Sequence, residues 1–253
     1  MAYTQLIAQE ISGGRVEEIK PGAAYRLILP RGSAGKYRLA QLDDYAKVPR
    51  RRFPLHTPVV LTLSARASSA SIPGTWGFGF WNYPFGISWD SVDIGWRLPT
   101  TPNAAWFFGA SEQNYLSFRD DKPGHGFLAQ AFRSPPFHPL LIAAGLAIPF
   151  SRKATRRLMA KVIDEDGVRL SVDVTQWHSY RLEWGEDRVS FAVDEAQVFE
   201  SPVSPRPRLG LVIWIDNQYA AFTPEGKIGF GVLENPEPLW LEIKDLEVDR
   251  GVR

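Results

Sequence analysis

The chain has no cysteine among its 253 residues. Without thiols it can form neither a disulfide framework nor a thiolate metal site, and it has no cysteine nucleophile. Histidine is also scarce, with four residues in all. His56, His138 and His178 stand apart in the sequence without the H-x-x-x-H spacing of metal ligands. We therefore expect no metal site and no cofactor, and we expect packing alone to stabilise the fold.

The sequence also lacks a charge excess and a long hydrophobic run. Its 29 basic and 28 acidic side chains leave a net charge of +1, so no overall field attracts nucleic acid, and we expect no nucleic-acid partner. The longest apolar run, Phe137–Phe150, is too short to cross a bilayer as a helix. Met1–Glu10 shows no basic segment followed by an apolar one, which favours a cytoplasmic protein without a signal peptide.

The chain is rich instead in short strand-like segments separated by clusters of Gly, Pro, Asn and Asp. These segments are Ala24–Leu29, Lys36–Leu42, Val59–Ala67, Thr75–Trp81, Val92–Trp96, Ala104–Phe108, Tyr115–Phe118, Arg169–Val174, Ser179–Trp184, Val189–Val193, Leu209–Ile215, Lys227–Gly231 and Leu239–Val248. No period of 20–50 residues repeats, which argues against a propeller or solenoid. The pattern predicts an all-β fold, an antiparallel β-sandwich of the jelly-roll type, with residues 1–253 forming a single domain.

One stretch, residues 135–165, departs from this pattern and is predicted to be a helical and apolar insertion. Within it, Arg152–Val162 is rich in helix formers and places Ala154, Leu158 and Met159 near one helix face. The helix could pack its apolar side on the sandwich. Alternatively, residues 137–163 could form a lid or touch a membrane surface.

The segment from Trp177 reads WHSYRLEWGEDRVSFAVDE and matches the pattern F/W-H-x-Y-x-x-E-W followed by I-x-F-x-V-D-G. This pattern is typical of one family of proteins. Further strands of that family are similar to Gly74–Trp81, Pro207–Ile215 and Leu239–Val248. The sequence thereby resembles family-sixteen glycoside hydrolases of the laminarinase-like type, within the concanavalin A-like lectin and glucanase superfamily. This resemblance implies a sandwich with a concave groove that holds carbohydrate.

The catalytic motif of that family, E-x-D-x-x-E, is missing from this sequence. Its nearest counterpart, Ser91–Trp96, keeps an acid at Asp93 but has Ser91 and Trp96 in place of the two glutamates. A hydroxyl and an indole cannot replace the carboxyl pair that retaining hydrolysis requires. We therefore predict that hydrolysis by the usual glutamate pair is absent, and whether the protein is an enzyme stays open.

Strand alternation predicts which side chains face a ligand groove. In Thr75–Trp81 the large residues at even positions share the core face, and the opposite face carries Gly77, Gly79 and Trp81. The two glycines should leave a flat floor that a ligand can approach. The candidate ligand-binding residues are Trp81, Asn82, Trp106, Trp214, Asp216, Asn217 and Gln218. Such a surface suits carbohydrate or a small apolar ligand, although the tryptophans could equally be half-buried structural residues.

The candidate catalytic residues are Asp93, Asp120 and His125. Asp120 or Asp121 could orient the His125 imidazole as an acid/base pair, because a carboxylate tunes an imidazole near neutral pH. The same loop, Arg119–Gly126, could also be a solvated hairpin without chemistry.

Three functions remain open from the sequence. The first is glycan binding or processing in an aromatic-lined groove. The second is a cytoplasmic enzyme or binder for a hydrophobic small molecule or lipid, with residues 137–163 as its lid. The third is a structural domain whose groove is filled by its own side chains.

Overall fold

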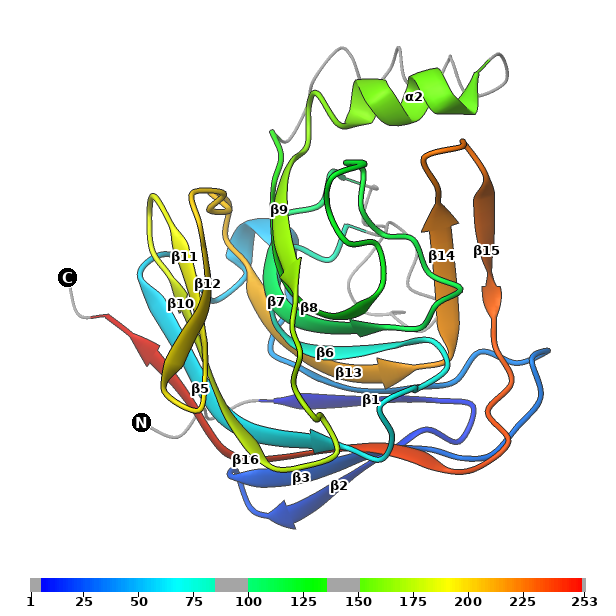
Figure 1. The fold of residues 1–253 in the computed structure, drawn as a ribbon. Coiled ribbons are helices and arrows are strands. Elements are labelled where there is room, and N and C mark those ends of the chain that lie inside the picture. Colours follow the sequence, from blue (N-terminus) through cyan, green and yellow to red (C-terminus); the bar gives the residue numbers. More distant parts are fainter. Residues whose placement is uncertain (1–5, 85–99, 136–150, 252–253) are drawn as a thin grey trace.

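A computed structural model describes residues 6–84, 100–135 and 151–251. Two seven-stranded antiparallel sheets face each other (Figure 1). Sheet A has the order β1 (Ile7–Ile11), β4 (Leu39–Asp43), β13 (Gly210–Asp216), β6 (Thr75–Trp81), β7 (Ala104–Ala110), β8 (Gly126–Arg133) and β9 (Asp164–Arg169). Sheet B has the order β12 (Ala196–Ser201), β11 (Val189–Val193), β10 (His178–Trp184), β5 (Val59–Ala67), β16 (Leu239–Arg250), β3 (Ala24–Leu29) and β2 (Arg15–Lys20). The predicted antiparallel jelly-roll sandwich is confirmed.

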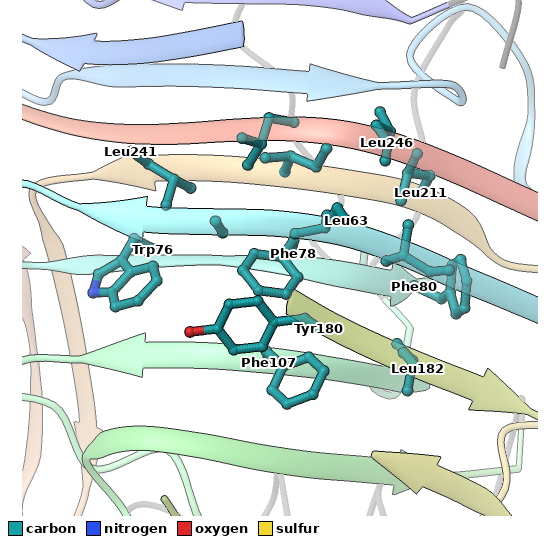
Figure 2. Packing of buried hydrophobic residues seen from close by; sticks show 14 of the residues in the cluster. Leu63, Trp76, Phe78, Phe80, Phe107, Tyr180, Leu182, Leu211, Leu241 and Leu246 are labelled. Carbon is teal, nitrogen blue, oxygen red and sulfur yellow. The ribbon is translucent and has the colours of Figure 1, made fainter. Parts of the chain in front are cut away.

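The core lies between the sheets and follows strand alternation. In β5 every second residue from Val59 to Ala67 is buried, which is the pattern of a strand with one face in the core. Phe78 of β6 and Phe107 of β7 meet Tyr180 of β10, with ring centroids 5.0 Å apart in both pairs. Figure 2 shows these aromatic rings from opposite sheets in contact. Apolar burial across this layer is the main favourable contribution to folding.

The segment that carries the family resemblance forms β10, β11 and β12. Asp194 and Glu195 make the β11–β12 turn with φ of 48° and 67°, a conformation that usually selects glycine at the second position. His178 stabilises this region because its Nδ1 lies 2.6 Å from Asp194 Oδ2 and its Nε2 lies 3.1 Å from the Asp173 carbonyl. The histidine of the motif therefore has a structural role in joining neighbouring turns.

Several strands lie where the sequence shows no strand pattern. The acidic segment Asp164–Arg169 forms β9 through pairing with β8, while the predicted strand Arg169–Val174 is mostly loop. Tyr115 of the predicted strand Tyr115–Phe118 makes only an isolated bridge to Ala221. The hairpin β14 (Gln218–Phe222) and β15 (Ile228–Val232) forms a separate two-stranded ribbon. The predicted strand Val92–Trp96 lies outside the described residues.

The predicted helix is present as α2 (Arg152–Met159), and Ser151 caps it by accepting a hydrogen bond from Ala154 N. Its buried face differs from the prediction, because Ala154 is exposed and Arg156 is buried. The surface under α2 explains the difference. Arg156 donates to the Phe222 carbonyl at 2.8 Å and to the Ser117 carbonyl at 2.9 Å, and it forms an ion pair with Asp120.

Figure 1 shows α2 lying beyond the end of sheet A, close to the tip of the β14–β15 ribbon. Leu158 and Met159 are half-buried, so part of the predicted apolar face does pack on the protein. Among the helices that the structure describes, none is long and apolar enough to span a membrane. The apolar run Phe137–Phe150 lies outside the described residues.

We expect Arg156→Ala to lower the free energy of unfolding by about 2–4 kcal/mol, because it leaves buried carbonyls without their charged donor. Urea unfolding measures this change. The adjacent Arg157 is exposed, so Arg157→Ala serves as the matched control and should change stability by less than about 0.5 kcal/mol. Equal effects of the two substitutions would contradict the assigned role of Arg156.

Candidate functional site

Three tryptophans meet on the outer face of sheet A, the face turned away from sheet B. Trp214, Trp81 and Trp106 come from the neighbouring strands β13, β6 and β7. The rings of Trp81 and Trp214 are parallel with centroids 6.2 Å apart, and Trp106 lies 5.8 Å from the first and 5.5 Å from the second. We call these three residues the tryptophan cluster.

Two glycines of β6 make room for the tryptophan cluster. A Cβ atom at Gly77 would lie 3.0 Å from the Trp214 ring and 2.3 Å from the Phe107 carbonyl oxygen. A Cβ atom at Gly79 would lie 2.6 Å from Trp106 Cα. The floor expected to be open to a ligand is therefore covered by the protein's own indoles, because these glycines admit neighbouring side chains and backbone.

A buried carboxylate, Asp216, holds the first tryptophan of the cluster. Trp214 Nε1 donates to Thr75 Oγ1 at 3.0 Å, and Thr75 Oγ1 donates to Asp216 Oδ1 at 2.8 Å. Gln218 N and Tyr37 OH also donate to this carboxylate, at 3.1 and 3.4 Å. Burial raises the pKa of Asp216 to about 7, even though its hydrogen-bond donors act in the opposite direction.

A similar series of hydrogen bonds, which we call a relay, connects Trp106 to Glu165 of β9. Trp106 Nε1 donates to Gln130 Oε1 at 3.3 Å, and Gln130 Nε2 donates to Glu165 Oε1 at 3.2 Å. The other carboxylate oxygen accepts a hydrogen bond from Phe118 N at 2.7 Å. Desolvation by burial raises the pKa of Glu165 above its ordinary value.

The third relay lies at the β4 end of the face. Trp81 Nε1 donates to Tyr45 OH at 2.6 Å, and Gln41 Nε2 donates to the same hydroxyl at 3.2 Å and to Asp43 Oδ2 at 2.9 Å. Gln9 also donates to Asp43 Oδ2. Burial raises the pKa of Asp43 as well. Each tryptophan of the cluster is thus connected to a different buried carboxylate, and the three acids anchor the indoles.

β7 pairs with β6 on the side away from β13, and it contains no acidic residue. It presents Ala104, Trp106 and Phe108 to the outer face. Nothing on β7 could act as the carboxyl pair of a retaining glycosidase. Asp93 and the window Ser91–Trp96 lie outside the described residues.

Four of the predicted ligand-binding residues lie together, namely Trp81, Trp106, Trp214 and Asp216. Two predicted amides have structural partners instead. Asn82 accepts from Asn103 N at 3.0 Å and donates to the Thr101 carbonyl at 2.9 Å. Asn217 accepts a hydrogen bond from Arg38 N and donates to the Lys36 and Leu233 carbonyls. Asn82 and Asn217 are both buried. Gln218 is half-buried at the start of β14.

The predicted catalytic loop is held by arginines. Asp120 pairs with Arg156, and Asp121 pairs with Arg119 at 2.8 Å. His125 contributes its carbonyl oxygen as the acceptor for Arg169. In the residues that the structure describes, no hydrogen bond joins the His125 imidazole to either aspartate, so the acid/base pair stays a prediction.

Sequence reasoning missed the polar residues behind the tryptophan cluster, especially Gln41, Asp43, Gln130 and Glu165. A signal for two of them exists. Gln41 and Gln130 stand at the centre of strands whose neighbours are apolar, in LAQLD and LAQAF. A lone amide in such a strand needs a buried partner, which predicts a hydrogen-bonded network. The part of the chain that the structure describes contains no group of three side chains able to hold a metal ion.

A separate depression of about 380 Å³ lies on the outer face of sheet B. Thr62, Ser64, Arg181 and Glu195 are among the residues that line it. It is on the opposite side of the sandwich from the tryptophan cluster, since these residues belong to sheet B and its β11–β12 turn. The depression therefore has no part in the anchored aromatic surface.

The raised pKa of Asp216 predicts a pH-dependent stability. The folded pKa of about 7 exceeds the ordinary value of 3.8, so this group favours folding most below pH 4 and loses that contribution as the pH rises toward 7. Asp216→Asn should make the slope of unfolding free energy between pH 4.5 and 7 less negative by up to about 1.4 kcal/mol per pH unit. Urea unfolding across this range gives the slope. The exposed Asp187 provides the control Asp187→Asn, and equal slopes in both variants would refute the assignment.

Comparison with known proteins gives no sequence match. No family model matches the chain, and no curated protein is detectably similar to it. Solved structures do resemble it. A GlcNAcα1-4Gal-releasing endo-β-galactosidase from Clostridium perfringens has a TM-score of 0.51 at 12% identity over 95% of this chain and 57% of its own.

A glycoside hydrolase family protein from Mycobacterium thermorestibile has a TM-score of 0.50 at 12% identity, over 89% of this chain and 76% of its own. The chain thus spans little more than half of the endo-β-galactosidase. At such low identity the likeness concerns the arrangement of the strands. The chain shares its antiparallel β-sandwich fold with these two proteins, as the sequence resemblance predicts.

Proposed function

We propose that this protein binds a glycan on the outer face of sheet A, with the indoles of Trp81 and Trp106 as the stacking surface. The observation that carries the proposal is the anchored tryptophan cluster. Trp81 and Trp106 are half-buried, while Trp214 is only 7% exposed and supports them. Two adjoining indoles therefore keep part of their surface for a ligand.

The relays behind the indoles favour binding because they set the ring orientations beforehand. The indole N–H groups of Trp81 and Trp106 donate to Tyr45 and Gln130, so the rings lose little freedom when a ligand arrives. Aromatic faces offer apolar area at fixed geometry, which suits the C–H face of a sugar ring. The endo-β-galactosidase and the glycoside hydrolase with the same fold are named for activities on glycans.

The proposal is recognition, without hydrolysis by a glutamate pair. β7 offers apolar side chains to this face. Asp43, Glu165 and Asp216 are buried and each is engaged with a different indole relay. A carboxylate that holds a structural hydrogen bond is poorly placed to attack a sugar or to protonate a leaving group.

The test is a titration of the protein with a panel of soluble β-glucans and β-galactans, followed by tryptophan fluorescence and calorimetry. Trp106→Ala should weaken binding roughly tenfold or more, since losing an aromatic contact of about 60 Å² costs about 1.5 kcal/mol. Reducing-end assays on the same mixtures should show no chain cleavage.

Trp177 supplies the control for that titration, because it is 37% exposed and follows a loop at sheet B. Trp177→Ala should leave affinity unchanged. The proposal fails if no glycan in the panel binds, or if both substitutions weaken binding equally. Retention of a hydrophobic small molecule that Trp106→Ala releases would favour the apolar-ligand hypothesis instead.

A further inference from the structure

Helix α2 carries a basic surface next to the tryptophan cluster. Arg152, Lys153 and Arg157 of the helix and Lys161 just after it are all exposed, and the helix sequence RKATRRLM contains no acidic residue. On the other side of the helix, Met159 belongs to the same apolar cluster as Trp81 and Trp106. Met159 therefore brings the helix to the edge of the proposed stacking surface, and the basic side chains lie on the exposed side of the helix.

A second basic surface borders the cluster from the side of the short helix η1 (Arg50–Arg52). Arg51, Arg52, Lys47 and Arg208 are exposed there, and Arg208 donates to the Phe53 carbonyl at 3.1 Å. The link to the tryptophans runs through Arg50 and Tyr83. Arg50 donates to the carbonyl of Tyr83, whose ring centroid lies 5.3 Å from that of Trp81.

These cations differ from those exposed arginines of the protein that are paired with an acid. Arg119, Arg181 and Arg188 each form an ion pair with a nearby carboxylate, whereas the exposed Arg15, Arg31 and Arg206 form none with the described residues. Within residues 6–84, 100–135 and 151–251, the exposed basic side chains of α2 and η1 named above form none. Two acids lie near α2: Asp120 pairs with the buried Arg156, and the charges of Lys227 and Lys153 help to lower the pKa of Glu225.

The described acids of the aromatic face lie beneath its surface. Asp43, Glu165 and Asp216 are buried, and burial raises the pKa of each of them. A chain with a net charge of only +1 thus places positive charge on two sides of its anchored indoles. Such an arrangement attracts a ligand that combines stacking rings with negative charge.

We infer that the glycan is an acidic polysaccharide, whose sugar rings stack on Trp81 and Trp106 while its sulfate or carboxylate groups pair with the basic side chains of α2 and η1. This inference rests on the proposed function and names its ligand class. Arginine suits both anionic groups because its planar guanidinium can donate two parallel hydrogen bonds. The contacts are exposed, so salt should weaken binding.

The experiment compares glycans that differ only in charge. Laminarin is paired with sulfated laminarin, and methyl-esterified polygalacturonate is paired with polygalacturonate, which separates sulfate from carboxylate. The intact chain should bind at least one anionic member about tenfold more tightly than its neutral partner at low salt, and this preference should shrink as salt rises toward about 0.3 M.

Two double variants test the basic surfaces, Arg157→Gln with Lys161→Gln and Arg51→Gln with Arg52→Gln. Each should weaken binding of the preferred anionic glycan by about three- to tenfold and leave binding of its neutral partner unchanged. The control, Arg15→Gln with Lys20→Gln, removes two exposed charges from β2 in sheet B and should have no effect.

Different failures have different meanings. If neutral and anionic members bind equally through Trp106, the proposed function stands and the acidic-glycan inference is wrong. If no glycan binds, the proposed function itself is wrong. Equal affinity for polyphosphate or DNA, unaffected by Trp106→Ala, would show a general polyanion surface and would also overturn the inference.

Discussion

Every buried polar side-chain atom in the described part of the chain has a hydrogen-bond partner, and on the outer face of sheet A this requirement decides how the tryptophans lie. An indole carries one N–H donor, so each tryptophan of the cluster needs an acceptor inside the protein. Thr75, Gln130 and Tyr45 meet this need, and they are connected in turn to buried acids. The glycines and carboxylates of this face fit that arrangement, because Gly77 and Gly79 leave room for neighbouring groups and the acids accept the last hydrogen bond of each series.

The same constraint determines what the described acids of this face do. A carboxylate used for retaining hydrolysis must face its partner carboxyl across the bond to be cleaved. Here Asp216 accepts hydrogen bonds from Thr75, Gln218 and Tyr37, and its oxygens are largely occupied. The face is therefore built for a fixed aromatic surface, in which acids orient indoles.

Buried and exposed cations of α2 are treated differently by the protein. Arg156 illustrates how the protein treats a cation that it buries, since the guanidinium is matched with two carbonyls and Asp120. Its exposed neighbours on α2 have no such partners within the described residues and stay available to solvent. The difference follows from desolvation, because a buried charge must be paired whereas an exposed one is hydrated.

Local pattern alone was sufficient for strands that alternate strictly. Val59–Ala67 and Thr75–Trp81 match β5 and β6 at both ends, because one face of each is packed in the core. β9 was missed, since DEDGVR has no apolar alternation and becomes a strand only by pairing with β8. The prediction of which side of α2 is buried was also wrong. Arg156 is buried because the carbonyls of Ser117 and Phe222 accept hydrogen bonds from its guanidinium.

The sequence by itself determined the sandwich class, the hairpin around His178 and the side of β6 and β13 on which Trp81 and Trp214 lie, since these depend on a two-residue period and on turn chemistry. Only the tertiary structure decided that Gly77 and Gly79 leave room for neighbouring groups and that Asp43, Glu165 and Asp216 anchor the indoles. The physical reason is that these contacts join strands far apart in the chain. Sheet order brings such strands together, and no local pattern encodes it.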